Sequence, residues 1–181
     1  MDFFETLKAR HSIRKYVEGA KVEESALTAI LEACNAAPSA GNLQGYRIIV
    51  VRSDDQKSAV AEAAYGQTFI TNAGVLLAFV ADFSVSAERY GDRAQLYAIQ
   101  DASIAATVAC YAATDLGLGT CWIGAFDDDQ MAKVLGVPEG SRPVAVIAVG
   151  KPDQSPSGRS RRPLDDIARE GKYDGPGFGG A

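Results

Sequence analysis

The sequence predicts one domain that mixes helices and strands, of the α+β or α/β class. The chain has 181 residues, close to the usual size of a single domain and enough to bury a core. Helical and strand-like hydrophobic patterns alternate along it, without an internal repeat or an interdomain linker. The predicted domain spans residues 1–170, and a flexible, glycine-rich tail, residues 171–181, follows it.

Two amphipathic helices and a loop are predicted at the N-terminus. In residues 2–9 apolar side chains recur at helical spacing, and this helix is expected to end near Arg10. Residues 23–36 place leucine, isoleucine and cysteine side chains on one face and two acidic residues in the first turn, where the helix dipole favours them. The proline, glycines and asparagine of residues 37–45 break this helix and predict a loop.

Strands and helices alternate in the middle of the chain. A strand is predicted over residues 46–51, a turn over 53–55 and a helix over 56–65. Residues 75–80 form an apolar run, which predicts a strand that is buried on both faces and central in its sheet. The longest helical pattern covers residues 93–116 and stops at two glycines, where a C-cap is expected.

The C-terminal part adds a strand over residues 120–124, a short helix over 128–135 and a strand over 144–149. A polar loop, residues 154–163, follows the last strand. The long helix before these elements is small and apolar nearly all round in residues 101–113. Such a helix is usually buried on every side, and in a chain this short another subunit could supply the second covering surface.

Composition excludes several classes of function. The formal net charge is -5 and the pI about 4.9, so neither nucleic acid nor a membrane surface is an expected partner. The N-terminus does not resemble a secretory signal, and the apolar runs are far shorter than the roughly 20 residues of a membrane helix, so a cytoplasmic location is expected. One histidine and three separated cysteines offer no zinc site, so no metal is expected. The cysteines lie in mostly apolar surroundings, which indicates buried thiols in a reducing compartment.

Basic residues gather near both ends of this acidic chain. Five of the 18 lie between Lys8 and Lys21, and six lie between Arg142 and Arg169. Guanidinium groups offer a planar fork of donors that matches phosphate, and a serine hydroxyl adds another donor. The candidate anion ligands are Arg10, His11, Ser12 and Arg14 near the start and Arg159, Arg161 and Arg162 near the end. The alternative is that Arg10 and His11 only close a helix C-terminus, where positive charge is favoured.

Two further segments could face a flat ligand. The loop 38–44 combines backbone freedom with two amides and a hydroxyl, which could bond the edge of a heterocycle, although an ordinary connection explains it equally well. Residues 117–124 lack the G-x-G-x-x-G order of a dinucleotide fingerprint and follow a helix instead of opening one. Gly124 and Ala125 would let a flat ligand touch the backbone, or would simply end an edge strand.

Other catalytic groups are not expected. His11 is the single histidine and has no obvious serine or cysteine nucleophile arranged with it, so a hydrolytic triad is not expected. Cys121, within an apolar strand, is expected in the core, and the aspartates of 127–129 are expected to cap a helix.

In this order, six segments of the chain resemble the FMN-dependent nitroreductase family. They are R-H-S-I-R-K-Y (10–16), A-P-S-A-G-N-L-Q (37–44), D-A-S-I-A-A (101–106), G-L-G-T-C-W-I-G-A-F (117–126), V-A-V-I-A-V-G-K-P (144–152) and R-S-R-R-P-L (159–164). The resemblance covers nearly the whole chain. It implies an α+β fold whose central, mostly antiparallel four-stranded sheet gains a strand from the partner and is flanked by helices. It also implies an intertwined homodimer with FMN at the subunit interface.

The resemblance also assigns residues to the cofactor. Residues near the two chain ends would hold the phosphate and ribityl chain: Arg10, His11, Ser12, Arg159 and Arg161. Arg14 would point toward the N1/C2=O edge of the flavin as an electrostatic stabiliser. The partner subunit would line the ring with four loop residues: Pro38, Ser39, Ala40 and Asn42. The backbone of Gly124 and Ala125 would lie near N5.

The implied activity is hydride transfer from NADH or NADPH onto flavin N5, followed by ping-pong reduction of a small electron-poor acceptor such as a nitroaromatic or a quinone. The flavin performs this chemistry, which explains why no catalytic acid–base pair is found. Gly45-Tyr46 stands where many relatives have Pro-Trp, and residues 82–92 lack the longer insertion of larger members. The resemblance therefore does not determine which acceptor is reduced. The alternatives are a non-catalytic flavin carrier or redox-responsive protein, and a specialised reductase, such as a dehalogenase, on the same fold.

Overall fold

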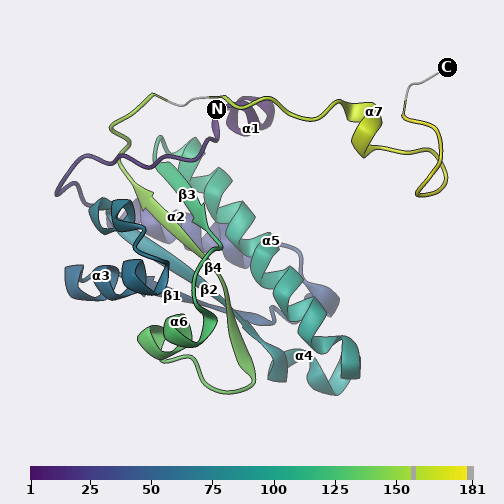
Figure 1. Cartoon of the computed structure of the whole chain (residues 1–181), viewed down its shortest axis with the longest axis horizontal. Coiled ribbons are helices and arrows are strands. Elements are labelled where there is room, and N and C mark those ends of the chain that lie inside the picture. Colours follow the sequence, from purple (N-terminus) through teal and green to yellow (C-terminus); the bar gives the residue numbers. More distant parts are fainter. Residues whose placement is uncertain (156–157, 179–181) are drawn as a thin grey trace.

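The computed structural model describes residues 1–155 and 158–178 and is built around a four-stranded antiparallel sheet (Figure 1). The strands are β1 (Tyr46–Val51), β2 (Val75–Asp82), β3 (Gly119–Ile123) and β4 (Ser141–Gly150). Their order is β1-β2-β4-β3, so β3 lies at an edge. The α+β class and the antiparallel sheet are confirmed. All of β2 is buried, in the central position that its apolar run predicts.

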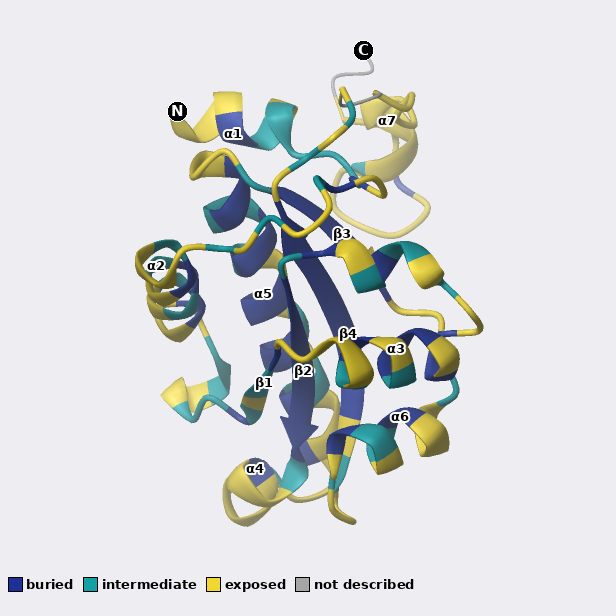
Figure 2. Ribbon diagram, turned by 90° about the vertical axis from the view of Figure 1, so that its left-hand side faces the viewer, coloured by how far each residue is buried: buried dark blue, intermediate teal, exposed yellow. Residues whose placement is uncertain are grey.

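Helices cover both faces of the sheet (Figure 2). On one face α2 (Glu24–Asn35) and α5 (Ala94–Asp115) pack against Leu77, Phe79 and Ile147. On the other face α3 (Asp54–Ala63) and α6 (Asp128–Leu135) pack against the alternate strand residues, among them Leu76 and Val146. Because successive strand side chains point to opposite faces, the apolar strands β2 and β4 contribute to two separate cores.

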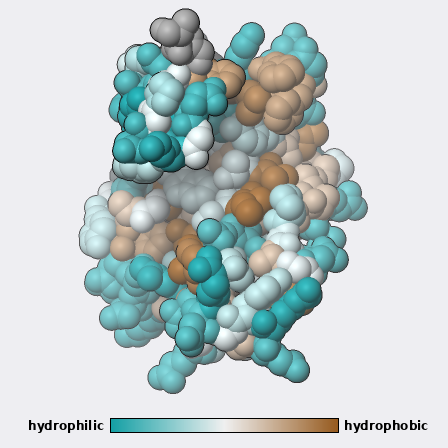
Figure 3. Space-filling view, turned by 90° about the vertical axis from the view of Figure 1, so that its right-hand side faces the viewer, coloured by the Kyte–Doolittle hydropathy of each residue, from teal (hydrophilic) through white to brown (hydrophobic). Residues whose placement is uncertain are grey.

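The long helix α5 is covered on one side only within the single chain. Its buried residues are mostly alanines, whereas Ile104 keeps 37% of its surface exposed and Thr107 is also exposed. Apolar side chains are exposed among polar ones in the middle of the face drawn in Figure 3. The helix ends before Gly117, whose φ of 77° is the left-handed conformation expected after a helix C-cap.

Several element boundaries differ from the predictions for local reasons. The predicted turn at 53–55 is the start of α3, because the Ser53 side chain accepts a hydrogen bond from Gln56 N and caps the helix. The strand predicted over 144–149 is longer, since β4 begins at Ser141, and a register shift between Phe79 and Val80 accommodates this extension. Helix α4 (Phe83–Tyr90) was not predicted, and Asp82 caps it by accepting from Ser84 N.

Short elements complete the described chain. Helix α1 (Phe3–Ala9) has a capping box formed by Asp2 and Glu5, and its C-cap is Arg10, as predicted. Single 3₁₀ turns occupy Ala40–Asn42, Thr68–Asn72 and Gly91–Arg93. None of the helices that the structure describes is long and apolar enough to cross a membrane.

The C-terminal segment runs away from the sheet and carries α7 (Leu164–Ile167) (Figure 1). Beyond α7 the chain turns back on itself, and Phe178 N donates to Ala168 O at 3.0 Å. The separation of a 1–170 domain from a 171–181 tail stays a prediction. Residues 179–181 of that tail and residues 156–157 of the polar loop lie outside the described residues.

Candidate functional site

The N-terminal basic segment lies along the edge strand β3. Ser12 forms a parallel bridge with Thr120, and Ile13 N donates to Thr120 O at 2.8 Å. Ile13 can approach this closely because position 119 is glycine, where a Cβ would lie 2.9 Å from Ile13 Cγ1. Ile13 is buried, whereas the next residue, Arg14, is exposed. The contact therefore fixes the segment against the sheet and leaves the Arg14 side chain on the open side.

The arginines of this segment affect the pKa values of two neighbouring cysteines, Cys121 and Cys110. Burial raises the pKa of Cys121, while nearby Arg14 and Arg10 and a hydrogen bond with Ser12 act in the opposite direction. Burial likewise raises the pKa of Cys110 to about 11, against a hydrogen bond with Thr120 and the charge of Arg10. Both thiols therefore stay protonated at neutral pH, as expected for core cysteines. Arg10, Ser12 and Arg14 share one end of β3.

The C-terminal segment arrives at the same place. A Cβ built on Gly158 would lie 3.7 Å from His11 Nε2, and Arg159 follows directly. The His11 ring is held by a 2.9 Å contact between Nδ1 and Ala9 O. Arg161 lies two residues farther along this exposed segment. The structure thus brings the start of the C-terminal basic segment, at Gly158, next to His11 of the N-terminal basic segment.

These arginines are not neutralised by the protein. In the part of the chain that the structure describes, the arginines with carboxylate partners are Arg47, Arg52 and Arg142. The predicted phosphate ligands and Arg14 form no ion pair there. Arg10 and Arg14 lie near Cys121 of the edge strand β3. Guanidinium groups without a carboxylate partner fit a phosphorylated ligand such as FMN.

The loop predicted to line a flat ligand is held by Asp101 of α5. Asp101 is only 2% exposed, and its carboxyl oxygens accept from Ala40 N at 2.8 Å and from Gly45 N at 3.2 Å. Gly41 and Asn42 adopt the left-handed backbone conformation, with φ of 56° and 59°. The Ser39 hydroxyl also accepts from Gln44 N at 3.1 Å. These bonds give residues 38–45 one defined shape.

Sequence reasoning did not assign Asp101 to the site. The available signal was a lone acidic residue within the apolar helical stretch 101–113, where a buried carboxyl group requires hydrogen-bond donors. Both of its donors lie more than 50 positions away in sequence, with separations of 61 and 56 residues. A local pattern could not reveal them.

Within one chain the loop and the basic groups lie apart along α5. The loop is tied to Asp101, whereas His11 and Thr120 line a small cavity of about 160 Å³ together with Thr114. From residue 101 to 114 a helix rises roughly 20 Å. Pro38, Ser39 and Ala40 instead border their own open cavity of about 570 Å³, with Tyr97 and Ile104 of α5.

The backbone that follows β3 is accessible to solvent at Gly124 and Ala125. Gly124 and Ala125 are exposed, and the nearest atom to a Cβ on Gly124 would be Trp122 Nε1, at 3.2 Å. The carbonyl of Ala125 accepts from Gln67 Nε2 at 3.0 Å. Gln67 is a second residue that sequence reasoning missed, and it fixes the segment that a flat ligand would meet.

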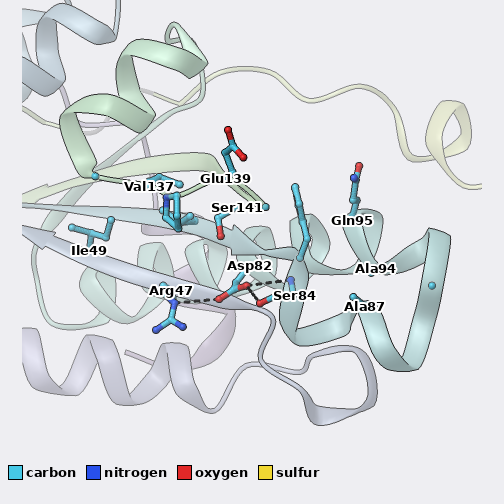
Figure 4. A pocket seen from close by; sticks show the side chains of 16 residues that line it. Arg47, Ile49, Asp82, Ser84, Ala87, Ala94, Gln95, Val137, Glu139 and Ser141 are labelled. Atoms are coloured by element: carbon cyan, nitrogen blue, oxygen red, sulfur yellow. Dashed lines mark hydrogen bonds and ion pairs between the residues drawn. The ribbon is translucent and has the colours of Figure 1, made fainter.

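A different pocket, of about 700 Å³, lies at the far end of β1 and β2 (Figure 4). Arg47 Nε donates there to Asp82 Oδ2 at 3.2 Å, and Asp82 also accepts from Ser84 at the start of α4. The Ser84 hydrogen bonds and Arg47 lower the pKa of Asp82, against the effect of burial. This carboxyl group thus caps a helix, and the pocket contains none of the predicted site residues.

The sequence and the fold are similar to those of known oxidoreductases. The profile described as "Nitroreductase family" matches residues 7–70 and 57–151. The FMN reductase [NAD(P)H] of Bacillus subtilis is 30% identical over 186 residues, covering 95% of this chain and 74% of its own. The NADH dehydrogenase of Thermus thermophilus is 33% identical over 186 residues, covering 87% and 90%. The structure of the NADPH:FMN oxidoreductase from Vibrio harveyi complexed with NAD+ superposes with a TM-score of 0.86 at 29% identity, covering 94% of this chain and 77% of that one. The chain belongs to the nitroreductase family.

Proposed function

We propose that this chain is an FMN-dependent oxidoreductase that takes hydride from NADH or NADPH and reduces a small electron-poor acceptor in a ping-pong reaction. The observation that carries the proposal is the contact of the C-terminal segment, at Gly158, with His11 of the N-terminal basic segment, which is bridged to the edge strand β3 at Ser12. The flavin and nicotinamide chemistry named for the relatives in Bacillus subtilis and Vibrio harveyi supports it. Nitroaromatics and quinones are the acceptor classes that we expect.

The phosphate and ribityl chain of FMN would lie against the two basic segments. Arg10, His11 and Ser12 supply donors from the N-terminal side, and Arg159 and Arg161 supply guanidinium groups from the C-terminal side. Charge-assisted bonds of this kind are roughly twice as strong as neutral ones, and the guanidinium fork fits phosphate oxygens.

The isoalloxazine ring would lie between Arg14 and the backbone of Gly124 and Ala125. Bound FMN supplies the hydride chemistry, so the chain has only to hold and orient it. Arg14 is placed to stabilise negative charge at the N1/C2=O edge. Gln67 fixes the Ala125 carbonyl, and Gly124 carries no side chain that would block one face of the ring.

A second copy of the chain would complete this site. The loop residues Pro38, Ser39, Ala40 and Asn42 lie about 20 Å away from the basic segments along α5, too far to share one ring within a single chain. Two antiparallel α5 helices related by a two-fold axis near Thr107 would set Asp101 of one opposite Thr114 of the other. The exposed Ile104 and Thr107 on α5 support this homodimer, with one FMN at each end of the helix pair.

Arg14→Ala is expected to slow reduction of the flavin by NAD(P)H by roughly 100-fold, because its charge matters most once electrons arrive. The dissociation constant for FMN should rise by less than about tenfold, since the other cations still hold the phosphate. Anaerobic stopped-flow absorbance measures the first quantity and fluorescence titration the second. A variant that loses FMN without slowing reduction of the flavin that stays bound would contradict the role given to Arg14.

The whole proposal is tested by the visible spectrum. Purified protein, reconstituted with FMN if necessary, should be yellow, should bleach when titrated with NADH or NADPH without oxygen, and should regain its colour with a quinone. A protein that stays colourless after incubation with FMN would refute the proposal. Tight FMN binding without bleaching by either nucleotide would instead identify a flavin carrier or a redox-responsive protein.

A further inference from the structure

Tyr97, at the start of α5, lines the cavity that the loop residues Pro38, Ser39 and Ala40 border. Arg93 Nε donates to the Tyr97 hydroxyl oxygen at 2.7 Å, and the Arg93 guanidinium carbon lies 5.0 Å from the centre of the Tyr97 ring. The Tyr90 ring meets the same ring edge-to-face, at a centroid distance of 4.8 Å. The tyrosine is therefore held from two sides.

The same corner of the fold also supports the loop. Arg89 Nη1 donates weakly to Gly41 O at 3.4 Å. A Cβ on Gly41 would collide with the Tyr90 hydroxyl and lie 2.8 Å from Arg89 Nη1, so the corner and the loop are in direct contact. Residues 89–97 thus contact the loop and hold Tyr97 at the same corner of the fold.

The bond from Arg93 decides where the Tyr97 proton can point. A phenol has one proton to donate, and here its oxygen already accepts from a cation. Within residues 1–155 and 158–178, no acceptor is found for that proton. Two other polar groups of the cavity are occupied, because Ser103 donates to Ile99 O and both Asp101 oxygens accept from backbone N–H groups.

We propose that Tyr97 donates a hydrogen bond to the oxygen of the acceptor that the flavin reduces, and that Arg93 is the residue that positions it. This inference rests on the proposed function. Tyr97 lies beside the 38–42 loop of its own subunit, so it reaches the acceptor only if the flavin held by the other subunit lies against that loop. The acceptors selected are those with a carbonyl or nitro oxygen conjugated to the reacting atoms, such as quinones.

The hydrogen bond acts on charge that develops during the transfer. A quinone that takes up one hydride equivalent gains two electrons and one proton, and one of its oxygens then carries a negative charge. A proton from solvent completes the hydroquinone. Tyr97 keeps its own proton throughout and stabilises the negative oxygen, as a preorganised donor does in an oxyanion hole.

Tyr97→Phe tests this directly, because it removes the hydroxyl and keeps the ring that packs on Tyr90. The holoenzyme is reduced with one equivalent of NADH or NADPH without oxygen and is then mixed in a stopped-flow instrument with 1,4-benzoquinone or with ferricyanide. We expect reoxidation by benzoquinone to slow roughly tenfold, while reoxidation by ferricyanide, which takes single electrons without bond formation, changes less than about twofold. Tyr173→Phe, a change on the exposed C-terminal segment, is the matched control and should change neither rate.

Arg93→Ala distinguishes positioning from a structural role. It should slow benzoquinone reoxidation in the wild-type background and have no further effect on that rate in the Tyr97→Phe background, because the two residues act through one bond. A loss that persists in the Phe background would show that Arg93 acts on the fold and would overturn its assigned role.

The outcomes separate this inference from the proposed function. Wild-type protein that binds no FMN, or whose FMN is not reduced by either nucleotide, overturns both. Wild-type protein that turns over normally, with Tyr97→Phe changing both acceptor rates equally or neither, overturns the role of Tyr97 alone.

Discussion

Asp101→Ala is expected to lower the free energy of unfolding by about 2–4 kcal/mol, because the buried N–H of Gly45 and the partly buried N–H of Ala40 lose their acceptor. The 38–45 loop would then sample other shapes, and FMN would have to order it on binding, which weakens FMN affinity by roughly tenfold or more. Urea denaturation of the apoprotein measures the first effect and FMN titration of the dimer the second.

Asp101→Asn is the matched control for this change. The amide keeps one carbonyl oxygen that can accept from Ala40 N, but its NH₂ group faces Gly45 N and cannot accept from it. We expect about half of the loss seen with alanine. Equal stability of the wild-type and alanine proteins would show that the two backbone bonds do not hold the loop.

The architecture was readable from the sequence wherever hydrophobic periodicity was strong. The apolar run at 75–80 predicted the central strand β2, and the helix predicted over 128–135 has the bounds of α6. Helix α4 was missed, although Phe83, Ala87 and Tyr90 recur at helical spacing. Its start is marked by Asp82, whose carboxyl group caps its first turn and binds Arg47 across the sheet.

The candidate site was only partly readable. Clusters of basic residues marked the N- and C-terminal segments, and the structure brings these segments together at His11. The bonds that shape the rest join residues far apart in sequence, as with Gln67 and Ala125, which are 58 positions apart. Such pairs leave no local periodicity, so only the folded chain reveals them.

Position 45 shows how one departure from the family pattern affects the site. The resemblance to the nitroreductase family implies a proline at the position of Gly45, and proline has no N–H to donate. Here Gly45 N donates to Asp101, so the loop gains a second bond to α5. A Cβ at this position would also lie 3.0 Å from Ser86 Oγ, a buried hydroxyl without a partner among the described residues. The glycine therefore permits both the bond and the close packing of α4.

Arg10→Ala combined with Arg161→Ala is expected to raise the dissociation constant for FMN by roughly 100-fold or more, since each change removes a charge-assisted bond to phosphate. The affinity for riboflavin, which has the same ring without phosphate, should change less than about threefold. Arg52→Ala is the control, because Arg52 pairs with Glu24 away from the site. Equal retention of FMN by the double variant and the wild type would remove these arginines from the site.

Joining the two sets of changes in one dimer tests where the site is built. One subunit carries Asp101→Ala and the other carries Arg10→Ala with Arg161→Ala, and differently tagged copies are co-expressed and purified as the mixed dimer. If each site takes arginines from one subunit and the loop from the other, the mixed dimer has one intact site and one doubly defective site. It should then bind one FMN for every two subunits with wild-type affinity, although neither parent homodimer binds FMN tightly. A site confined to one chain would instead leave both sites singly defective, and no tight binding would be recovered.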